Sequence, residues 1–382
     1  MNNCYLCDEF LTSETESKEH ILLNSIGGRL KSKELLCKTC NSKFGHEADG
    51  ELARQLAFLS SYLQIKRESG NNPIIKDAKT QDGKGYNIVD GSKPVLAKPR
   101  FEKKIENGET KYSIAARNEK ELINILKGLR KKHPELDLEL AKEKFQWQEK
   151  YLDEPLTHNI TIGGDLAFKS IVKTAVNYYI HTQKDIEQVE HLFPYLKGET
   201  DLKIGKHFYP TKPIYKKESN EVVHLIHLVG IKHSKQLYCF IEFFSAYSFL
   251  VHLSDNYKGE NISTTYCYDI LQNKELNKQV TLKLKVEEIA EIYKMTKNDF
   301  EIITEKLNRV MGIANKKQVD NEIGNITKKA IDKVFDKYKH EPVVTEQMIN
   351  EFSHEVANAY VRFAFRGQKR KSFDKTDEQD KE

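Results

Sequence analysis

Apolar residues return every three or four positions in several stretches of the chain, and this spacing predicts amphipathic helices. The first helix is predicted from Asn41 to about residue 68, where a Ser-Gly-Asn-Asn-Pro stretch ends it. Further helices are predicted at 118–133, which His133-Pro134 closes, and at 165–182. Three more follow at about 286–312, 319–338 and 344–364.

Between these helices the pattern is typical of strands. Residues 70–116 are predicted to be β-rich, with a hairpin turn at Asn107-Gly108. A denser group of strands is predicted at 222–231, 236–244, 247–253 and 263–268, and the short gaps favour an antiparallel meander. The fold class is therefore predicted to be α+β, with a small N-terminal domain followed by a larger mixed domain that has an antiparallel sheet and C-terminal helices.

The order of these elements predicts four segments along the chain. Residues 1–68 form a small N-terminal domain, and residues 69–160 form a β-hairpin and helix region. Residues 161–366 form an α+β domain for which three roles stay open: targeting, sensing a ligand, or oligomerisation. Residues 367–382 are rich in charge and are predicted to be a disordered tail.

Composition narrows the class of protein. With 382 residues, 31% of them charged, and a mean hydropathy of −0.64, the chain is expected to be soluble. It has no apolar run long enough for a membrane span and no apolar export signal, so a cytoplasmic location is expected. The net charge of +4 supports a nucleic-acid partner only weakly. We find no phosphate-binding or dinucleotide-binding glycine loop.

Four of the six cysteines form two Cys-x-x-Cys pairs in the first 40 residues, namely Cys4, Cys7, Cys37 and Cys40. Without an export signal, such pairs indicate a metal site rather than disulfides. Four thiolates complete the tetrahedral sphere of Zn²⁺ and leave no open position, so this zinc is predicted to be structural. The alternative is that these cysteines are four free thiols that bind no metal. Cys239 and Cys267 are predicted to be buried thiols.

A Glu-His dipeptide lies between the two cysteine pairs, and an Asn follows the last cysteine at once: Glu19, His20 and Asn41. Taken alone, His20 fits a surface, a core or a catalytic histidine. Imidazole titrates near neutral pH and can act as a general base, while Glu19 and Asn41 offer the hard oxygen ligands that suit Mg²⁺ or Mn²⁺. This combination is that of a site that cleaves phosphodiester bonds.

The set Glu19-His20-Ile21, Gly27-Gly28 and Cys37-x-x-Cys40-Asn41 resembles the HNH endonucleases, also called ββα-metal nucleases, and within them the subclass with a four-cysteine zinc. The resemblance covers roughly residues 1–55. It implies His20 as general base, one Mg²⁺ or Mn²⁺ on Glu19 and Asn41, and DNA as the substrate. By family analogy, it also suggests a role in microbial restriction or anti-phage defence.

The chain departs from the family pattern at two places. Glu19 stands where the family often has Asp, and the hairpin lacks the Asn that braces the histidine in many members. Asn24 or a backbone carbonyl is therefore the candidate for orienting His20. Asp49 is a further candidate metal contact, with a solvent-facing acid as the alternative, and His46 is expected at the surface.

Other features carry weaker signals. Arg29, Lys31, Lys33, Lys38 and Lys43 would attract a phosphate backbone or form an ordinary solvated face, and the basic stretches 127–132 and 366–371 have the same two readings. His224, His227 and His252 are predicted to be structural histidines. Two alternatives to a DNA nuclease stay open, namely a zinc module that binds nucleic acid or protein without cutting, and RNA as substrate. A homo-oligomer or a regulatory partner also stays open.

Overall fold

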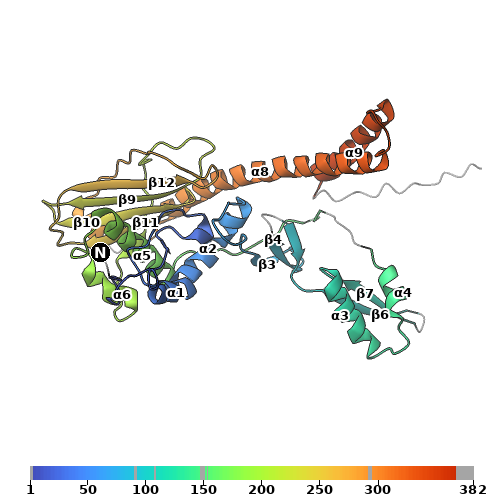
Figure 1. Cartoon of the computed structure of the whole chain (residues 1–382), viewed down its shortest axis with the longest axis horizontal. Helices are drawn as coiled ribbons and strands as arrows, with labels where there is room; N and C mark the ends of the chain where they lie inside the picture. The colour runs from blue at the N-terminus through green and yellow to red at the C-terminus, as the bar shows by residue number, and fades with distance from the viewer. Residues whose placement is uncertain are drawn as a thin grey trace, which may run out of the picture. The chain divides into compact units, whose positions relative to one another are not determined.

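The structure is a computed structural model, and it describes residues 3–89, 93–106, 109–146, 151–152, 154–290 and 295–366. The chain forms two compact units. The first unit consists of Met1–Ile75, Ile88–Lys93 and Ile160–Lys317, and the second consists of Lys76–Asn87, Pro94–Asn159 and Gln318–Glu382. The mixture of helices and antiparallel sheets confirms the predicted α+β class (Figure 1). The boundaries of the four predicted segments stay a prediction.

The N-terminal segment, residues 3–68, begins with a short antiparallel pair of strands, β1 (Glu19–His20) and β2 (Lys31–Ser32). A 3-10 turn, η1 (Asn24–Ile26), and two glycines connect them. Gly27 has φ +88°, and a Cβ on Gly28 would lie 2.1 Å from the carbonyl oxygen of Leu22. The connection therefore needs glycine at both positions, the first for its backbone angle and the second for its lack of a side chain.

Two helices follow where one was predicted. They are α1 (Lys38–His46) and α2 (Ala48–Tyr62), and the chain breaks between them at Glu47, which has φ −102° and ψ −93°. The prediction of a single helix from Asn41 to about residue 68 is therefore wrong. Gly45 has weak helix propensity, and the apolar face of α2 is buried in the core. The break re-aims α2 relative to α1.

A six-stranded antiparallel sheet dominates the first unit. Its order is β13-β12-β9-β10-β11-β8. The strands are β8 (Gly205–His207), β9 (Val223–Ile231), β10 (Gln236–Phe243), β11 (Tyr247–Ser254), β12 (Ile262–Asp269) and β13 (Lys274–Glu275). Strands β9, β10 and β11 form the predicted meander, but β12 returns to pair with β9. A four-strand meander was therefore the wrong topology, because β8 already occupies the free edge of β11.

Both faces of the sheet are covered, so its central strands are buried almost without interruption. Helix α5 (Asp165–Gln183) packs on one face, where Phe168 meets Phe249. A cluster that includes Val223, Leu225, Tyr238 and Phe240 fills the other face. Short helices complete this part of the unit: η2 (Glu190–Leu192), α6 (Phe193–Lys197) and α7 (Val286–Ala290).

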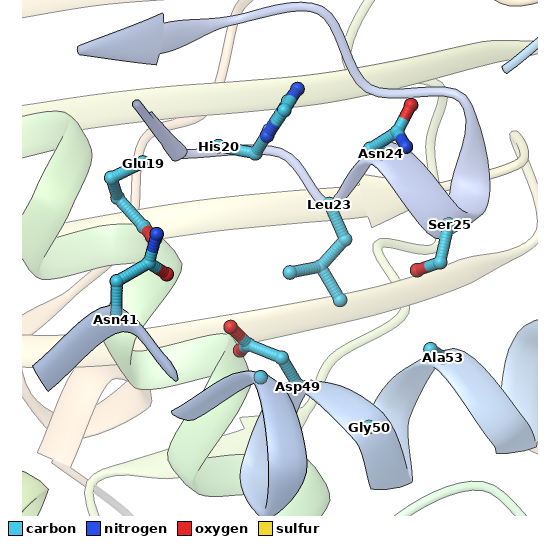
Figure 2. Close-up of a pocket in the computed structure, with 10 residues that line it drawn as sticks. Glu19, His20, Leu23, Asn24, Ser25, Asn41, Asp49, Gly50 and Ala53 are labelled. Carbon is cyan, nitrogen blue, oxygen red and sulfur yellow. The ribbon is translucent and has the colours of Figure 1, made fainter. Parts of the chain in front are cut away.

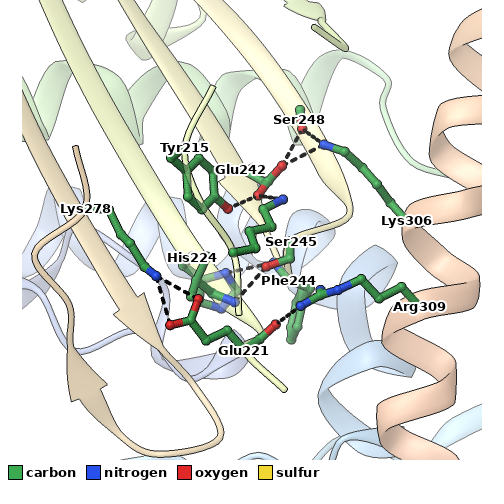
Figure 3. Close-up of polar contacts among 12 residues, drawn as sticks. Tyr215, Glu221, His224, Glu242, Phe244, Ser245, Ser248, Lys278, Lys306 and Arg309 are labelled. Atoms are coloured by element: carbon green, nitrogen blue, oxygen red, sulfur yellow. Dashed lines mark hydrogen bonds and ion pairs between the residues drawn. The ribbon is translucent and has the colours of Figure 1, made fainter. Parts of the chain in front are cut away.

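Charged groups join the start of helix α8 (Lys297–Lys337) to the sheet (Figure 3). The carboxylate of Glu242 on β10 is fully buried and lies 2.7 Å from the ammonium groups of both Lys217 and Lys306. Burial alone would raise the pKa of Glu242, but these two cations lower it to about 2. Arg309 donates to the backbone oxygen of Glu221 at 2.7 Å. The pairing keeps an otherwise costly buried charge compensated.

Residues 75–146 form small sheets and helices. The strands are β3 (Ile75–Lys79), β4 (Gly85–Val89), β5 (Lys93–Leu96), β6 (Arg100–Glu106) and β7 (Glu109–Ala115). The predicted β-rich region is confirmed, although its turn at Asn107-Gly108 lies outside the described residues. Helix α3 (Glu119–Arg130) begins where Asn118 accepts the N–H of Glu121, close to the prediction, and α4 (Leu138–Glu143) follows.

The C-terminal helices differ from the prediction in two respects. The predicted helix at about 286–312 is not one helix, because α7 ends at Ala290, residues 295–296 are not helical, and α8 begins at Lys297. Helix α8 is continuous, so the predicted gap between 312 and 319 does not exist, and α9 (Glu346–Ala364) matches its predicted range. The stretch Ile-Ala-Asn-Lys-Lys-Gln at 313–318 has no glycine or proline to stop a helix. No helix in the described part of the chain combines the length and apolar composition of a membrane span. The predicted tail, 367–382, lies outside the described residues.

Candidate metal centre and nuclease cleft

The four cysteines of the two Cys-x-x-Cys pairs converge in the first unit. The sulfur atoms of Cys4, Cys7, Cys37 and Cys40 all lie within 4.8 Å of one another, and those of Cys7 and Cys37 are 3.6 Å apart. A tetrahedral zinc with bonds of about 2.3 Å would place its sulfurs ~3.8 Å apart, so the cluster fits Zn²⁺. The N–H of Cys40 donates to the sulfur of Cys37 at 3.5 Å and caps helix α1. Four sulfurs leave no position for substrate, so the fit is to a structural zinc.

Next to this cluster, the predicted site residues line one cleft of about 220 Å³. Strand β1 supplies Glu19 and His20, α1 supplies Asn41, and α2 supplies Asp49. In Figure 2 the side chains of Glu19 and Asn41 point toward each other, and the His20 ring projects away from them. This divergence follows from the strand, because successive residues point to opposite sides. Carboxylate and carboxamide oxygens are the donors that Mg²⁺ or Mn²⁺ prefers.

Glu19 lies at the floor of this cleft and is only 1% exposed. Its Oε1 lies 2.6 Å from the ammonium of Lys173 and accepts a hydrogen bond from Asn177 at 3.0 Å. Burial raises the pKa of Glu19, and Lys173 opposes that effect. Among the described residues, none forms a hydrogen bond to Oε2 of Glu19. That oxygen and the side-chain oxygen of Asn41 are of the kind that a divalent cation prefers, and whether they hold one stays a prediction.

Asp49 faces helix α5, which also carries Lys173 and Asn177. Its Oδ1 accepts the hydroxyl of Ser170 at 2.6 Å, and its Oδ2 lies 2.5 Å from the ammonium of Lys173. Burial would lower the pKa of Lys173, but the carboxylates of Glu19 and Asp49 outweigh burial and hold it above its usual value. Asp49 is buried rather than solvent-facing. Whether it also contacts a metal stays a prediction.

The His20 ring is held by a residue that lies outside the β1–β2 hairpin. Its Nε2 lies 3.0 Å from Oε2 of Glu68, whose other oxygen binds the ammonium of Lys31. Lys31, and after it His20, lower the pKa of Glu68 to about 2. Asn24 forms no hydrogen bond to His20; instead its Oδ1 accepts the N–H of Glu68 at 2.9 Å. The hydrogen-bond partner of the His20 ring is therefore Glu68, and Asn24 fixes the backbone that carries it.

The match to a family model agrees with this geometry. Residues 4–57 match the model described as HNH endonuclease, a span that contains the four cysteines and the acidic and amide residues of the cleft. The N-terminal segment is an HNH domain. No curated protein and no solved structure matched the chain. At the level of the family, the HNH domain indicates nuclease activity on a nucleic-acid substrate.

Three residues around the HNH domain were missed from the sequence: Lys173, Asn177 and Glu68. The first two lie on α5, more than a hundred residues along the chain, and no short motif joins them to Glu19. One signal was available, however. Ser170, Lys173 and Asn177 are polar positions at helical spacing between the apolar residues of the helix centre, which marks a buried polar face.

The basic stretch of the HNH domain is largely engaged in local contacts. Lys31 pairs with Glu68, Lys33 pairs with Glu16, and Arg29 donates to the backbone oxygen of Lys66 at 2.7 Å. His46 is exposed, as expected. These contacts leave the cations at the surface but hold their side chains in place, so phosphate binding by this stretch stays a prediction.

The sheet histidines support the fold. His224 is fully buried; its Nε2 lies 2.8 Å from the carbonyl oxygen of Ile26, and its Nδ1 accepts the N–H of Phe244 at 3.1 Å (Figure 3). His227 bonds Thr265 at 2.8 Å. Among the described residues, the four cysteines form the group of three or more His, Cys, Asp or Glu side chains that could hold a metal ion, and none of the sheet histidines belongs to it. Cys239 and Cys267 are buried, as predicted.

Proposed function

We propose that the protein is an endonuclease that hydrolyses DNA phosphodiester bonds with the help of one Mg²⁺ or Mn²⁺. The convergence of Glu19 and Asn41 on one cleft, with His20 at its rim and a four-cysteine cluster beside it, carries this proposal. Glu19 and Asn41 would hold the cation. When bound, the cation would stabilise the negative charge that develops on the phosphate and on the leaving oxygen.

His20 is assigned the role of general base. Since the Glu68 carboxylate can only accept a hydrogen bond, the proton of neutral His20 lies on Nε2 and the lone pair on Nδ1. The described residues form no hydrogen bond to Nδ1, so this nitrogen can take the proton of an attacking water. Its side chain is 25% exposed, so water and a phosphate can reach it. Attack with departure of the 3′-oxygen leaves 5′-phosphate and 3′-hydroxyl ends.

The substrate and the biological role are proposed from the chemistry of phosphate contacts and from family analogy. Contacts to phosphates carry little sequence information, so cleavage by the HNH domain is expected to be weakly sequence-specific. A role in microbial restriction or anti-phage defence is proposed by analogy with nucleases that join an HNH domain to a larger region. That larger region, with its sheet and long helices, would supply targeting or control.

The alternative is a zinc module that binds nucleic acid or protein without cutting it. One observation favours this alternative, namely that the ammonium of Lys173 already balances part of the negative charge of Glu19 and Asp49. A site that is compensated in this way needs a cation less than two bare carboxylates would. The alternative and the nuclease differ in whether a divalent ion turns on hydrolysis.

The test is cleavage of supercoiled plasmid by the zinc-loaded full chain with Mg²⁺, Mn²⁺ or EDTA. We expect nicking or linearisation with either ion, none with EDTA, and a large loss in Glu19→Gln, which keeps the shape but not the charge. If folded wild type cuts neither plasmid nor single-stranded or branched DNA with either ion, the nuclease proposal fails. Cleavage of RNA alone would reassign the substrate.

A further inference from the structure

Helix α5 presents a polar stripe toward the HNH domain. Ser170, Lys173 and Asn177 lie three and four residues apart, which places them on one face of the helix, and all three are fully buried. Burial of a lysine is costly unless its charge is paired and hydrogen-bonded. The surroundings of Lys173 must therefore explain why it is there.

The ammonium of Lys173 is enclosed by three elements of the HNH domain. It lies 2.6 Å from Glu19 of β1, 2.5 Å from Asp49 of α2, and 5.1 Å from the ring centre of Phe44 in α1. One cation thus sits between two carboxylates, above the face of an aromatic ring. The group carries a net charge of about −1 when all three ionisable side chains are charged.

The neighbours of Lys173 restrict each carboxylate differently. Both oxygens of Asp49 accept from α5, one from Ser170 and one from Lys173. For Glu19, the hydrogen bond from Asn177 and the short distance to Lys173 both involve Oε1. Asn177 is itself held by the hydroxyl of Tyr5 at 2.7 Å. Tyr5 stands between the first two zinc cysteines, so the zinc loop and α5 together fix Glu19.

We propose that Lys173 sets the charge of the HNH site, an inference that rests on the proposed function. Asn177 holds Glu19 through Oε1 so that Oε2 is offered to the divalent cation. The ammonium of Lys173 balances one of the two carboxylate charges, and Asp49 serves as the counter-ion of Lys173 rather than as a ligand of that cation. The larger region of the chain thereby sets both the geometry and the charge of the nuclease site. With Lys173 in place, the site takes up a single divalent ion.

Two variants that differ in the net charge of this group test the proposal. Lys173→Met leaves two buried carboxylates and a net charge one unit more negative, whereas Lys173→Met with Asp49→Asn restores the original charge. Mn²⁺ binding to the full chain is measured by electron paramagnetic resonance without nucleic acid. The control is Lys169→Met, one helical turn earlier on α5, where the lysine lies 5.9 Å from the Tyr195 ring centre and contacts neither carboxylate.

We expect Lys173→Met to bind Mn²⁺ about tenfold more tightly than wild type, or to bind a second ion. The double variant and Lys169→Met should bind within about threefold of wild type, with one ion per chain. A double variant that binds at least about tenfold more weakly would make Asp49 a metal ligand and overturn the inference. Unchanged Mn²⁺ affinity in Lys173→Met would overturn it as well.

The melting temperature without divalent ions shows whether a change in Mn²⁺ affinity comes only from loss of folding. Lys173→Met is expected to melt lower than wild type, because it leaves the buried carboxylates unpaired, and Asp49→Asn should recover part of the loss. If Lys173→Met does not fold, the double variant alone decides the question through its Mn²⁺ affinity. Failure of the proposed function is separate, since a protein that shows the expected Mn²⁺ pattern but never cuts upholds the inference and refutes the nuclease.

Discussion

The buried His224 should make the first unit sensitive to mild acid. The ring is neutral in the fold, since Nδ1 accepts the N–H of Phe244 while Nε2 donates to Ile26 in the turn that precedes the glycine pair. A second proton, on Nδ1, would place the N–H of the His224 ring against the backbone N–H of Phe244, so that two hydrogen-bond donors would face each other. Burial lowers the pKa of His224 to about 4, against about 6.5 in an unfolded chain.

The sign and size of the effect follow from proton linkage. Because the folded pKa is depressed, the unfolded chain binds the proton first, so stability is full above pH 6.5 and falls as the pH drops toward 4. Between pH 7.5 and pH 5, the two pKa values give a loss of about 2 kcal/mol in the free energy of unfolding from His224 alone. Other titrating groups, including His227, add to the total loss.

His224→Gln isolates this contribution. Glutamine can donate to Ile26 and accept from Phe244, yet it does not titrate. Urea unfolding at pH 7.5 and pH 5, followed by circular dichroism, should show wild type losing about 2 kcal/mol more than His224→Gln across this range. Equal losses in the two proteins, within about 0.5 kcal/mol, would refute the assignment of His224 as a neutral, doubly bonded core histidine.

Three further results are expected. Cys40→Ala should abolish the binding of one zinc per chain, measured by metal analysis, and unfold the HNH domain, because structural zinc contributes about 10–16 kcal/mol; a full thermal transition in the zinc-free variant would argue against this. Gly28→Ala should lower the melting temperature sharply, since its Cβ would meet the Leu22 carbonyl oxygen at 2.1 Å, whereas Gly45→Ala, with no atom within 4 Å, should leave it level or raise it. Glu68→Ala should slow cleavage about tenfold or more at unchanged zinc content, because the His20 ring loses the group that orients it; a wild-type rate would show that the contact has no role.

Local pattern was enough for much of the fold. Helices α3 and α5 and the strands β9 to β12 follow directly from the period of their apolar residues. The break at Glu47 and the position of β12 do not, because each depends on where a segment meets the rest of the core. Nothing in the sequence of β11 reveals that β8 takes its free edge.

The residues of the candidate site also fall into those that the sequence predicted and those that it did not. Glu19, His20 and Asn41 could be found because they lie close to cysteines whose spacing is itself a strong signal. Glu68 and Lys173 could not, because their partners come from distant parts of the chain, and ion pairs between such residues leave no fixed spacing. The polar stripe of α5 was the one sequence signal we found for this part of the site. It indicates that these polar side chains are buried, but it does not identify the residues that they contact.

The most direct test of the account is the single-turnover rate of DNA cleavage by His20→Ala beside His46→Ala. Both variants remove one histidine from the HNH domain, but His46 is exposed on α1 and does not line the cleft. We predict that His20→Ala lowers the Mg²⁺-dependent rate by about 10²–10⁴-fold at unchanged zinc content, while His46→Ala cuts like wild type. A His20→Ala rate within a few-fold of wild type would contradict the central claim that His20 is the base of a nuclease site.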